Sequence, residues 1–433
     1  MDRKQFIEAL DEAIAQDRVT EVTNKQFEKN CGLPERIVRS SILHELRPSV
    51  IEAIKNEGSL TSIGNRMIHR GNGASAIGDD WAAGFLIEQA LKIGAEAAID
   101  GLERILATEE TEALCIMAIR GINCTSEAEL AGGIRIIPFE ELPPSTRKND
   151  LQNSLFYSFF NDTSVSAFNP RQIGPADVAR SALVANVTLR PFVFDSEKME
   201  RTKIYDPTMD AMRCLNDIRL CLSVSGHCCP LQEVSWVQLA DETLEVASSV
   251  SRGVSYQQSD VMPRDITDSI LSDFSIIQPL AEAFLALPEK YKEQMRFVLS
   301  RLIQSLLRRD TGDRAVDLSI ALESLLLGSE RGDNRFKLGL RAGLLSTEDV
   351  SQKLNNCHFI RAMYDIRSDL IHGTGVPERK KVIGKGNLPV KEIVTEATEI
   401  ARKVIATLIT GGEISDWHEI ELSGGLPGEE AKG

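Results

Sequence analysis

Apolar side chains recur every three or four residues in the first third of the chain, which is the spacing of helices with one buried face. Near the N-terminus this spacing is kept by Phe6, Ala9, Leu10 and Ile14. Residues 81–106 form a long run rich in Ala, Leu, Ile and Glu, with few residues that break helices. The pattern predicts a mainly helical N-terminal domain over residues 1–130.

The middle of the chain changes to an alternation of period two, which is typical of strands. Apolar positions alternate in this way over residues 134–136, 183–190 and 220–225. Residues 161–174 keep neither period, and we expect a loop there. These features predict a β-containing middle domain over residues 131–255.

The helical spacing returns at about residue 256 and continues almost to the C-terminus. It predicts a helix ending near 308–310, one ending at Gly328, one over 335–345, one capped by Ser346 and ending at Gly373, and one from Pro389 to Gly412. Such helices form an antiparallel bundle over residues 256–415, followed by a flexible tail over 416–433. The chain is therefore expected to be an α+β protein of several domains.

Composition narrows the class of protein. The 433 residues are 42% hydrophobic and 26% charged, which is ordinary globular usage, and the length suggests about three domains. The 64 acidic side chains outnumber the 49 basic ones, for a net charge of −15. An acidic surface repels phosphates, so any nucleic-acid site has to be locally basic.

The expected compartment is a reducing cytoplasm, and the expected protein is soluble. The start of the chain is polar and lacks the apolar core of a signal peptide. The longest apolar stretch, residues 113–119, is far shorter than the roughly 20 residues that span a bilayer. Eight cysteines without a Cys-x-x-Cys pair do not make a disulfide scaffold, and we expect Cys214 and Cys221 to pack in strands.

No metal site or cofactor is expected. His227, Cys228 and Cys229 form the only tight His/Cys cluster, but adjacent cysteines cannot readily bind one metal together, and no second pair follows at zinc spacing. The glycine-rich phosphate loops and the motifs of serine hydrolases and zinc proteases are also absent.

An Arg and a His with four residues between them lie where one predicted helix ends. They are Arg367 and His372, in the segment Tyr364-Asp-Ile-Arg-Ser-Asp-Leu-Ile-His-Gly373. The segments Ala321-Leu-Glu-Ser-Leu-Leu-Leu327 and Phe336-Lys-Leu-Gly-Leu-Arg-Ala342 precede this pair. Arg39 and His44 have the same spacing but lack these surroundings, and we interpret that copy as an ordinary helix end.

This ordered set of segments resembles the Apea-like subgroup of the HEPN superfamily, over roughly residues 260–415. The resemblance implies a metal-independent RNA endonuclease that serves antiphage defence or acts as a regulated toxin. It implies that Arg367 and His372 are catalytic, and that two copies of the motif face each other in a homodimer. Residues 1–255 would then sense a phage-derived or cellular trigger, or regulate the bundle.

The two residue types suit cleavage of RNA by its own 2′-hydroxyl. An imidazole titrates near neutral pH and can transfer protons, and a guanidinium can stabilise the charged phosphorane. Helical geometry alone places Arg367 and His372 about 140° apart around the axis. A left-handed Gly373 would end the helix and let His372 turn towards Arg367. The carbonyl end of the helix also favours an imidazolium.

Five further side chains are candidates for supporting roles. Asp369 could orient the imidazole, and Ser368 could hydrogen-bond a phosphate, although many active HEPN members carry Asn, Asp or His at that position. Tyr364 is expected to pack with its hydroxyl at the rim of the site. For Glu323 and Arg341 we favour an ion pair between buried helices over a direct catalytic role.

A basic segment follows the motif. In residues 376–391, Arg379, Lys380, Lys381, Lys385 and Lys391 stand against Glu378, a net charge of +4 in an acidic chain. Its Gly and Pro content predicts a loop, which either contacts the RNA backbone or is simply a solvated surface. The alternative function is a catalytically inactive module that binds RNA or a nucleotide, or only dimerises.

Overall fold

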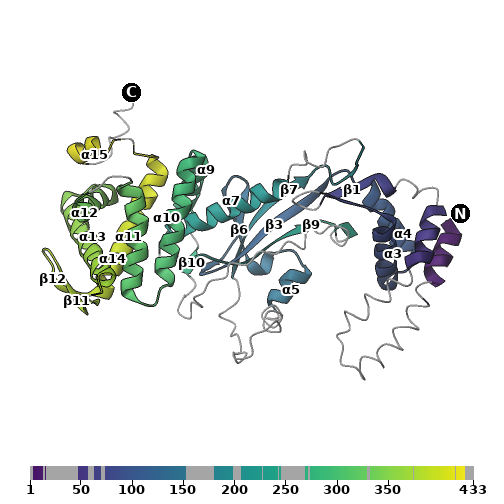
Figure 1. The fold of residues 1–433 in the computed structure, drawn as a ribbon, viewed down its shortest axis with the longest axis horizontal. Coiled ribbons are helices and arrows are strands. Elements are labelled where there is room, and N and C mark those ends of the chain that lie inside the picture. The colour runs from purple at the N-terminus through teal and green to yellow at the C-terminus, as the bar shows by residue number, and fades with distance from the viewer. Residues whose placement is uncertain are drawn as a thin grey trace, which may run out of the picture. The chain divides into compact units, whose positions relative to one another are not determined.

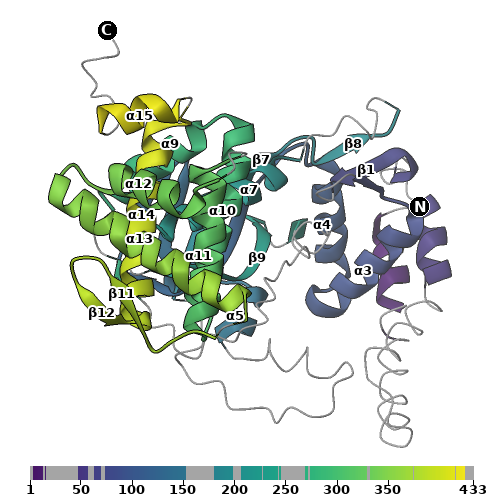
Figure 2. The same cartoon turned by 60° about the vertical axis from the view of Figure 1, so that its left-hand side comes forward.

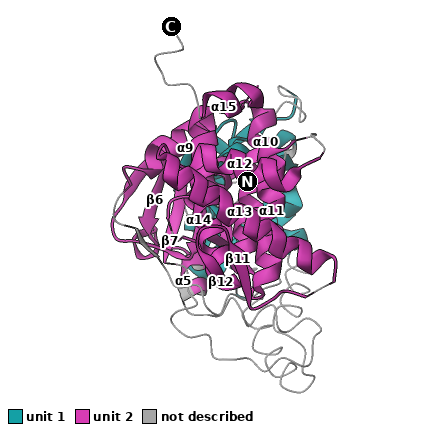
Figure 3. Cartoon of the chain, turned by 90° about the vertical axis from the view of Figure 1, so that its left-hand side faces the viewer, with its two compact units in different colours: residues 1–115, 186–211, 236–254 teal, residues 116–185, 212–235, 255–433 magenta. Residues whose placement is uncertain are grey.

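The chain is a mixed α+β protein with a helical C-terminal region (Figure 1). The computed structural model describes residues 3–12, 15, 47–56, 63–69, 74–152, 180–197, 206–226, 228–241, 243–244, 269–271, 274–328, 332–373, 375–414 and 416–424. Two compact units are coloured in Figure 3; they comprise residues 1–115, 186–211 and 236–254, and residues 116–185, 212–235 and 255–433. This division differs from the three consecutive domains expected from the sequence, because the chain passes from one unit to the other several times.

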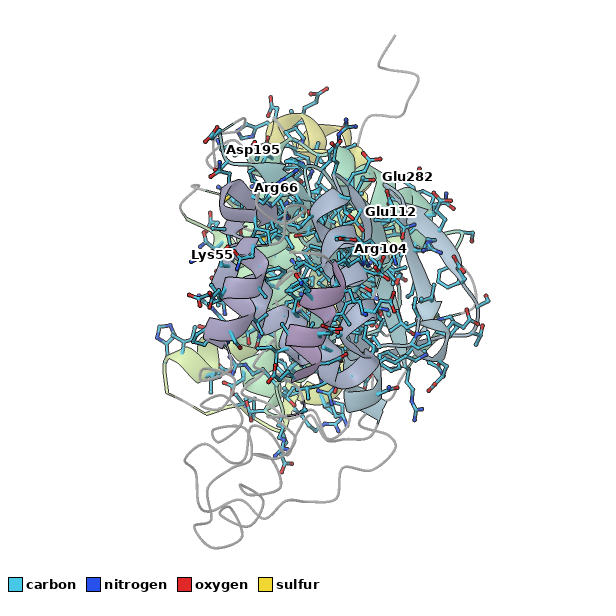
Figure 4. All side chains as sticks on the ribbon, turned by 90° about the vertical axis from the view of Figure 1, so that its right-hand side faces the viewer. Lys55, Arg66, Arg104, Glu112, Asp195 and Glu282 are labelled. Carbon is cyan, nitrogen blue, oxygen red and sulfur yellow. The ribbon has the colours of Figure 1, made fainter. Side chains whose placement is uncertain are left out.

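The first unit contains helices and a small antiparallel sheet of order β2-β1-β8. Its elements are helices over 3–12 and 47–56, η1 (Ile63–Asn65), β1 (Arg66–His69), β2 (Ala74–Ala76), α3 (Asp79–Ile93), α4 (Ala95–Ala107) and β8 (Val193–Asp195). Arg66 and Asp195, labelled in Figure 4, lie opposite each other in the β1–β8 register. Gly94, with φ of +90°, separates α3 from α4, so the helical run over 81–106 is two helices.

A five-stranded sheet of order β5-β6-β7-β3-β9 forms the middle of the chain. Its strands are β3 (Thr111–Arg120), β5 (Ala128–Ala131), β6 (Ile134–Pro138), β7 (Ser181–Leu189) and β9 (Leu231–Leu239), while β4 (Ile122–Cys124) pairs in parallel with β10 (Ser269–Leu271). β6 is antiparallel to β5 and β7. Gly132 and Gly133 join β5 to β6 with positive φ at both positions, as a two-residue hairpin turn requires. The strands predicted near 134–136 and 183–190 are confirmed.

One prediction about secondary structure is wrong, and another is incomplete. Helices are the commoner element among the described residues of 1–130, but β1 to β5 also begin there. Residues 220–225 are not a strand, because α7 (Pro207–Leu222) covers the first three of them and carries Cys214 and Cys221. Leu220, Cys221 and Leu222 are all buried, and a short apolar run buried on several sides has no period that separates helix from strand. The connecting elements here are η2 (Phe139–Glu141) and α5 (Thr146–Gln152).

The C-terminal region packs its helices side by side, as Figures 1 and 2 show for α10 to α14. The helices are α9 (Ile277–Ala286), α10 (Glu289–Leu307), α11 (Thr311–Leu326), α12 (Asn334–Ser346), α13 (Val350–Ile371), α14 (Val390–Gly411) and α15 (Trp417–Ser423). Their shared core includes Leu302, Leu322, Met363, Ile366 and Val404. None of the described helices combines the length and the apolar composition needed to cross a membrane.

Three local expectations for this region need correction. Ser346 is the last residue of α12, and the N-cap of α13 is Asp349, whose carboxylate accepts from the backbone N–H of Gln352 at 2.7 Å. The predicted basic loop contains an antiparallel hairpin of β11 (Arg379–Val382) and β12 (Gly386–Pro389). The predicted flexible tail begins with α15, whose Ile420 is buried.

Two glycines let α12 and α13 approach closely. A Cβ built on Gly343 would lie 2.6 Å from the backbone oxygen of Lys353, and one built on Gly339 would lie 2.6 Å from Cγ of Arg361. Distances this short do not occur between real Cβ atoms and their neighbours. The close contact between α12 and α13 therefore requires glycine, which has no side chain, at positions 339 and 343.

The variant Gly343→Ala is expected to lower the free energy of unfolding by about 1–3 kcal/mol, because the new methyl group pushes against the backbone of α13. In a helix without such a neighbour the same change stabilises by roughly 1 kcal/mol. Urea denaturation of both proteins measures the difference. An unchanged or raised midpoint for Gly343→Ala would contradict this account of the packing.

Candidate active site

Arg367 lies on α13 between α11 and a tyrosine of its own helix. Its Nη2 is 3.8 Å from a carboxylate oxygen of Glu323, and its guanidinium carbon is 5.1 Å from the centre of the Tyr364 ring. The side chain remains 25% exposed. Within the described residues its Nε is buried without a hydrogen-bond partner. The guanidinium thus lies against a charge and a ring, and no described residue accepts a hydrogen bond from it.

Tyr364 lies near polar side chains of two other helices, Glu323 of α11 and Asn334 of α12. Burial raises the pKa of the Tyr364 phenol, and the charge of Glu323 raises it further. The ring packs on the core of the helical region and is half-buried, as predicted. Asn334 was not singled out from the sequence, because nothing in the spacing of residues 334 and 364 marks them as neighbours.

His372 is the C-cap of α13. Its backbone N–H donates to the carbonyl of Ser368 at 3.0 Å, and Gly373 follows with φ of +72°. The predicted left-handed glycine that ends the helix is therefore confirmed. The imidazole is exposed, and it makes no hydrogen bond or ion pair with any described residue. The structure places Arg367 and His372 at the same helix end but does not bond them to each other.

The hairpin lies against α13 next to this helix end. Lys380 forms an ion pair with Asp369, and Val382, two residues on, is buried. Because side chains alternate along a strand, Arg379 and Lys381 fall on the other face, and both are exposed. Lys385 is also exposed, in the turn. Of the four predicted RNA-binding residues, Lys380 thus contacts α13, and Arg379, Lys381 and Lys385 face outward.

Asp369 and Ser368 complete the end of the helix. Asp369 was expected to orient the His372 imidazole, and the structure gives it Lys380 as an ion-pair partner. Ser368 is half-buried, and its carbonyl accepts from His372. The start of α11 borders the same region, since a Cβ on Gly312 would lie 3.2 Å from Leu370 and 2.7 Å from Val376.

The predicted ion pair between Glu323 and Arg341 does not form. Arg341 is 1% exposed; its Nε donates to Glu421 at 2.8 Å and its Nη1 to the carbonyl of Leu326 at 2.5 Å. Its guanidinium carbon lies 4.5 Å from the centre of the Trp417 ring. Arg341 of α12 therefore binds α15 and the C-terminal end of α11. The two polar residues point to different neighbours, and only Glu323 belongs to the candidate site.

Other candidates from the sequence lie elsewhere. Arg39, His44 and His227 fall outside the described residues, as do residues 161–174. Cys228 and Cys229 are buried, and burial raises the pKa of the Cys229 thiol to about 12. In the part of the chain that the structure describes, no group of three His, Cys, Asp or Glu side chains is arranged to hold a metal ion.

Comparison with known proteins identified no relative of this chain. The chain matches no protein-family model, and no curated protein and no solved structure matches it.

Proposed function

We propose that the chain is a metal-independent RNA endonuclease of the HEPN type, with its active site at the C-terminal end of α13. The observation that carries the proposal is the combination of groups at this one helix end. A partly exposed guanidinium, an exposed imidazole and a hairpin with three outward-facing cations lie together there. These are the groups that phosphodiester cleavage by an internal nucleophile needs.

In this proposal Arg367 binds the scissile phosphate and His372 transfers protons. The 2′-hydroxyl of the substrate attacks the adjacent phosphorus, and the 5′-oxygen of the next nucleotide leaves with a proton. Charge builds up on the phosphate oxygens, where a forked, permanently charged guanidinium is most effective. The products are a 2′,3′-cyclic phosphate and a free 5′-hydroxyl.

We further propose that the working enzyme is a homodimer in which two such helix ends face each other. The separation of Arg367 and His372 around the helix supports a composite site, since the two groups of one chain are not bonded together. Residues 1–255 would sense a trigger or restrain the nuclease, in a cytoplasmic role in antiphage defence or as a regulated toxin. This assignment rests on the resemblance stated above.

The test is incubation of the purified full chain with total cellular RNA in the presence of EDTA. Fragments that end in cyclic phosphate are the expected result. Intact RNA together with measurable RNA binding would overturn the nuclease proposal in favour of an inactive binding module. The contacts of Arg367 with Glu323 and Tyr364 are compatible with such a module. Intact RNA without binding would leave dimerisation as the function of the helical region.

The double variant Lys381→Gln/Lys385→Gln is expected to weaken RNA binding in a salt-dependent way. Each cation that contacts a phosphate releases counterions, so losing two contacts lowers the slope of log affinity against log salt by about 1.4 for a single strand. Fluorescence anisotropy with labelled RNA across a salt series measures this. The matched control is Lys290→Gln/Lys403→Gln, two exposed lysines outside the hairpin. Equal slopes in both double variants would show that the hairpin does not contact RNA.

A further inference from the structure

The β11–β12 hairpin is anchored to α13 by one of its faces. Val382 is 1% exposed in the core of the helical region, and Leu388 of the paired strand packs against the same core. Lys380, which lies opposite Leu388 in the register, forms the ion pair with Asp369 of α13. An isolated two-stranded hairpin is only marginally stable in water, so these contacts fix its orientation beside α13 (Figures 1 and 2).

The opposite, outer face of the hairpin carries positive charge and no acid. Arg379 and Lys381 alternate with the anchored residues of β11, and both are exposed. Asn387 lies opposite Lys381 in the register and is also exposed, so the two side chains share this face. Residues 379–389 contain no Asp or Glu, in a chain whose net charge is −15. The outer face therefore offers a locally basic surface to phosphates.

An apolar side chain stands at the tip of this basic face. The backbone N–H of Lys385 donates to the carbonyl of Val382 at 3.0 Å, and Gly384 has φ of 80°. A turn with positive φ at its third residue requires glycine there, and it places Ile383 at the corner. The Ile383 side chain is 52% exposed. The tip thus presents one large apolar group between two cations, Lys381 and Lys385.

We propose that this outer face binds an unpaired stretch of RNA, with Ile383 packed between two of its bases and the cations on the backbone phosphates. Arg379 and Lys381 are two residues apart on one strand, about 6.6 Å. Adjacent phosphates along an extended nucleic-acid strand have a similar separation. The exposed amide of Asn387 can donate to or accept from a base edge on the same face. The choice of RNA as the ligand rests on the proposed function.

The apolar tip favours an unpaired strand over a duplex or a membrane. In an A-form duplex the bases are stacked, and the major groove is too deep and narrow for side chains to read. Unpaired bases can separate and admit an aliphatic side chain, as base steps do around the apolar wedges of architectural proteins. A lipid surface fits less well, because a whole myristoyl chain gives only marginal membrane binding and a single isoleucine buries much less.

The test titrates the full chain into a short 2′-O-methylated RNA that contains 2-aminopurine, whose fluorescence rises when the base unstacks. Methylation blocks the 2′-hydroxyl, so binding is measured without cleavage. We expect wild type to raise the fluorescence, and Ile383→Ser to lose this rise and bind about fivefold more weakly, the effect of leaving half an isoleucine in water. The salt dependence should not change, since no charge is removed. Ile276→Ser, at an isoleucine that is 73% exposed before α9, is the matched control and should behave like wild type.

Equal affinity and equal fluorescence in wild type and Ile383→Ser overturn the inference. Equal affinity of wild type for the single strand and for the same strand annealed to its complement also overturns it, and this comparison needs no variant. Binding to vesicles that contain phosphatidylserine, without binding to RNA, overturns it in favour of a lipid surface. Cleavage of unmodified RNA tests the proposed function separately: binding that depends on Ile383 without any cleavage overturns only the nuclease, and cleavage without a role of Ile383 in binding overturns only this inference.

Discussion

His372→Ala and Arg367→Ala are each expected to abolish RNA cleavage in EDTA while the protein stays folded. Loss of a proton-transfer group typically costs 10²- to 10⁴-fold in rate, and loss of a charge-stabilising donor about 10²- to 10³-fold. Both side chains are partly or fully exposed and make no hydrogen bond to another described residue, so their removal should disturb the fold little. Gel-based cleavage assays and size-exclusion chromatography measure the two effects.

The same helix offers matched controls for both changes. His358→Ala removes a half-buried imidazole of α13 outside the site. Arg361→Ala removes an arginine that also lies over an aromatic ring, 4.5 Å from the centre of Phe336. These controls should cleave RNA like the wild type. Cleavage retained in both His372→Ala and Arg367→Ala would show that the catalytic site lies elsewhere.

Arg341→Ala is expected to lower the free energy of unfolding by about 3–5 kcal/mol, the usual cost of breaking a buried ion pair by removing one partner. The change leaves the Leu326 carbonyl without its donor and Glu421 without its cation, and it removes the support of the Trp417 ring. It also opens a cavity, because Arg341 is among the largest fully buried side chains. Urea denaturation followed by circular dichroism measures the shift.

Glu421→Gln is the milder counterpart of this change. The glutamine can still accept a hydrogen bond from Arg341 on a partly exposed rim, so we expect a loss of about 1 kcal/mol. Trp417→Ala should lower the free energy of unfolding by an amount between those of the other two variants, since it removes only the ring. If Arg341→Ala were as stable as Glu421→Gln or more stable, Arg341 would not be the residue that holds α15 in place.

The polar residues of the site show that spacing along the chain does not predict which side chains pair between helices. Glu323 and Arg341 were matched to each other as the polar positions of neighbouring helices, yet Glu323 faces Arg367 and Arg341 faces Glu421. Which turn of one helix meets which turn of another depends on crossing angles that the local sequence does not contain. The same applies to Asn334 and Tyr364, and to Asp369 and Lys380.

The amino-acid sequence by itself determined the features that depend on neighbours along the chain. Helical spacing, Gly373 and Pro389 located α13 and α14, and the motif placed Arg367 and His372 at one helix end. Only the tertiary structure decided that residues 220–222 are helical, that the basic segment is a hairpin, and which charges pair. The physical reason is range: periodicity and caps act within a few residues, whereas pairing and burial on several sides are set by segments far apart in the chain.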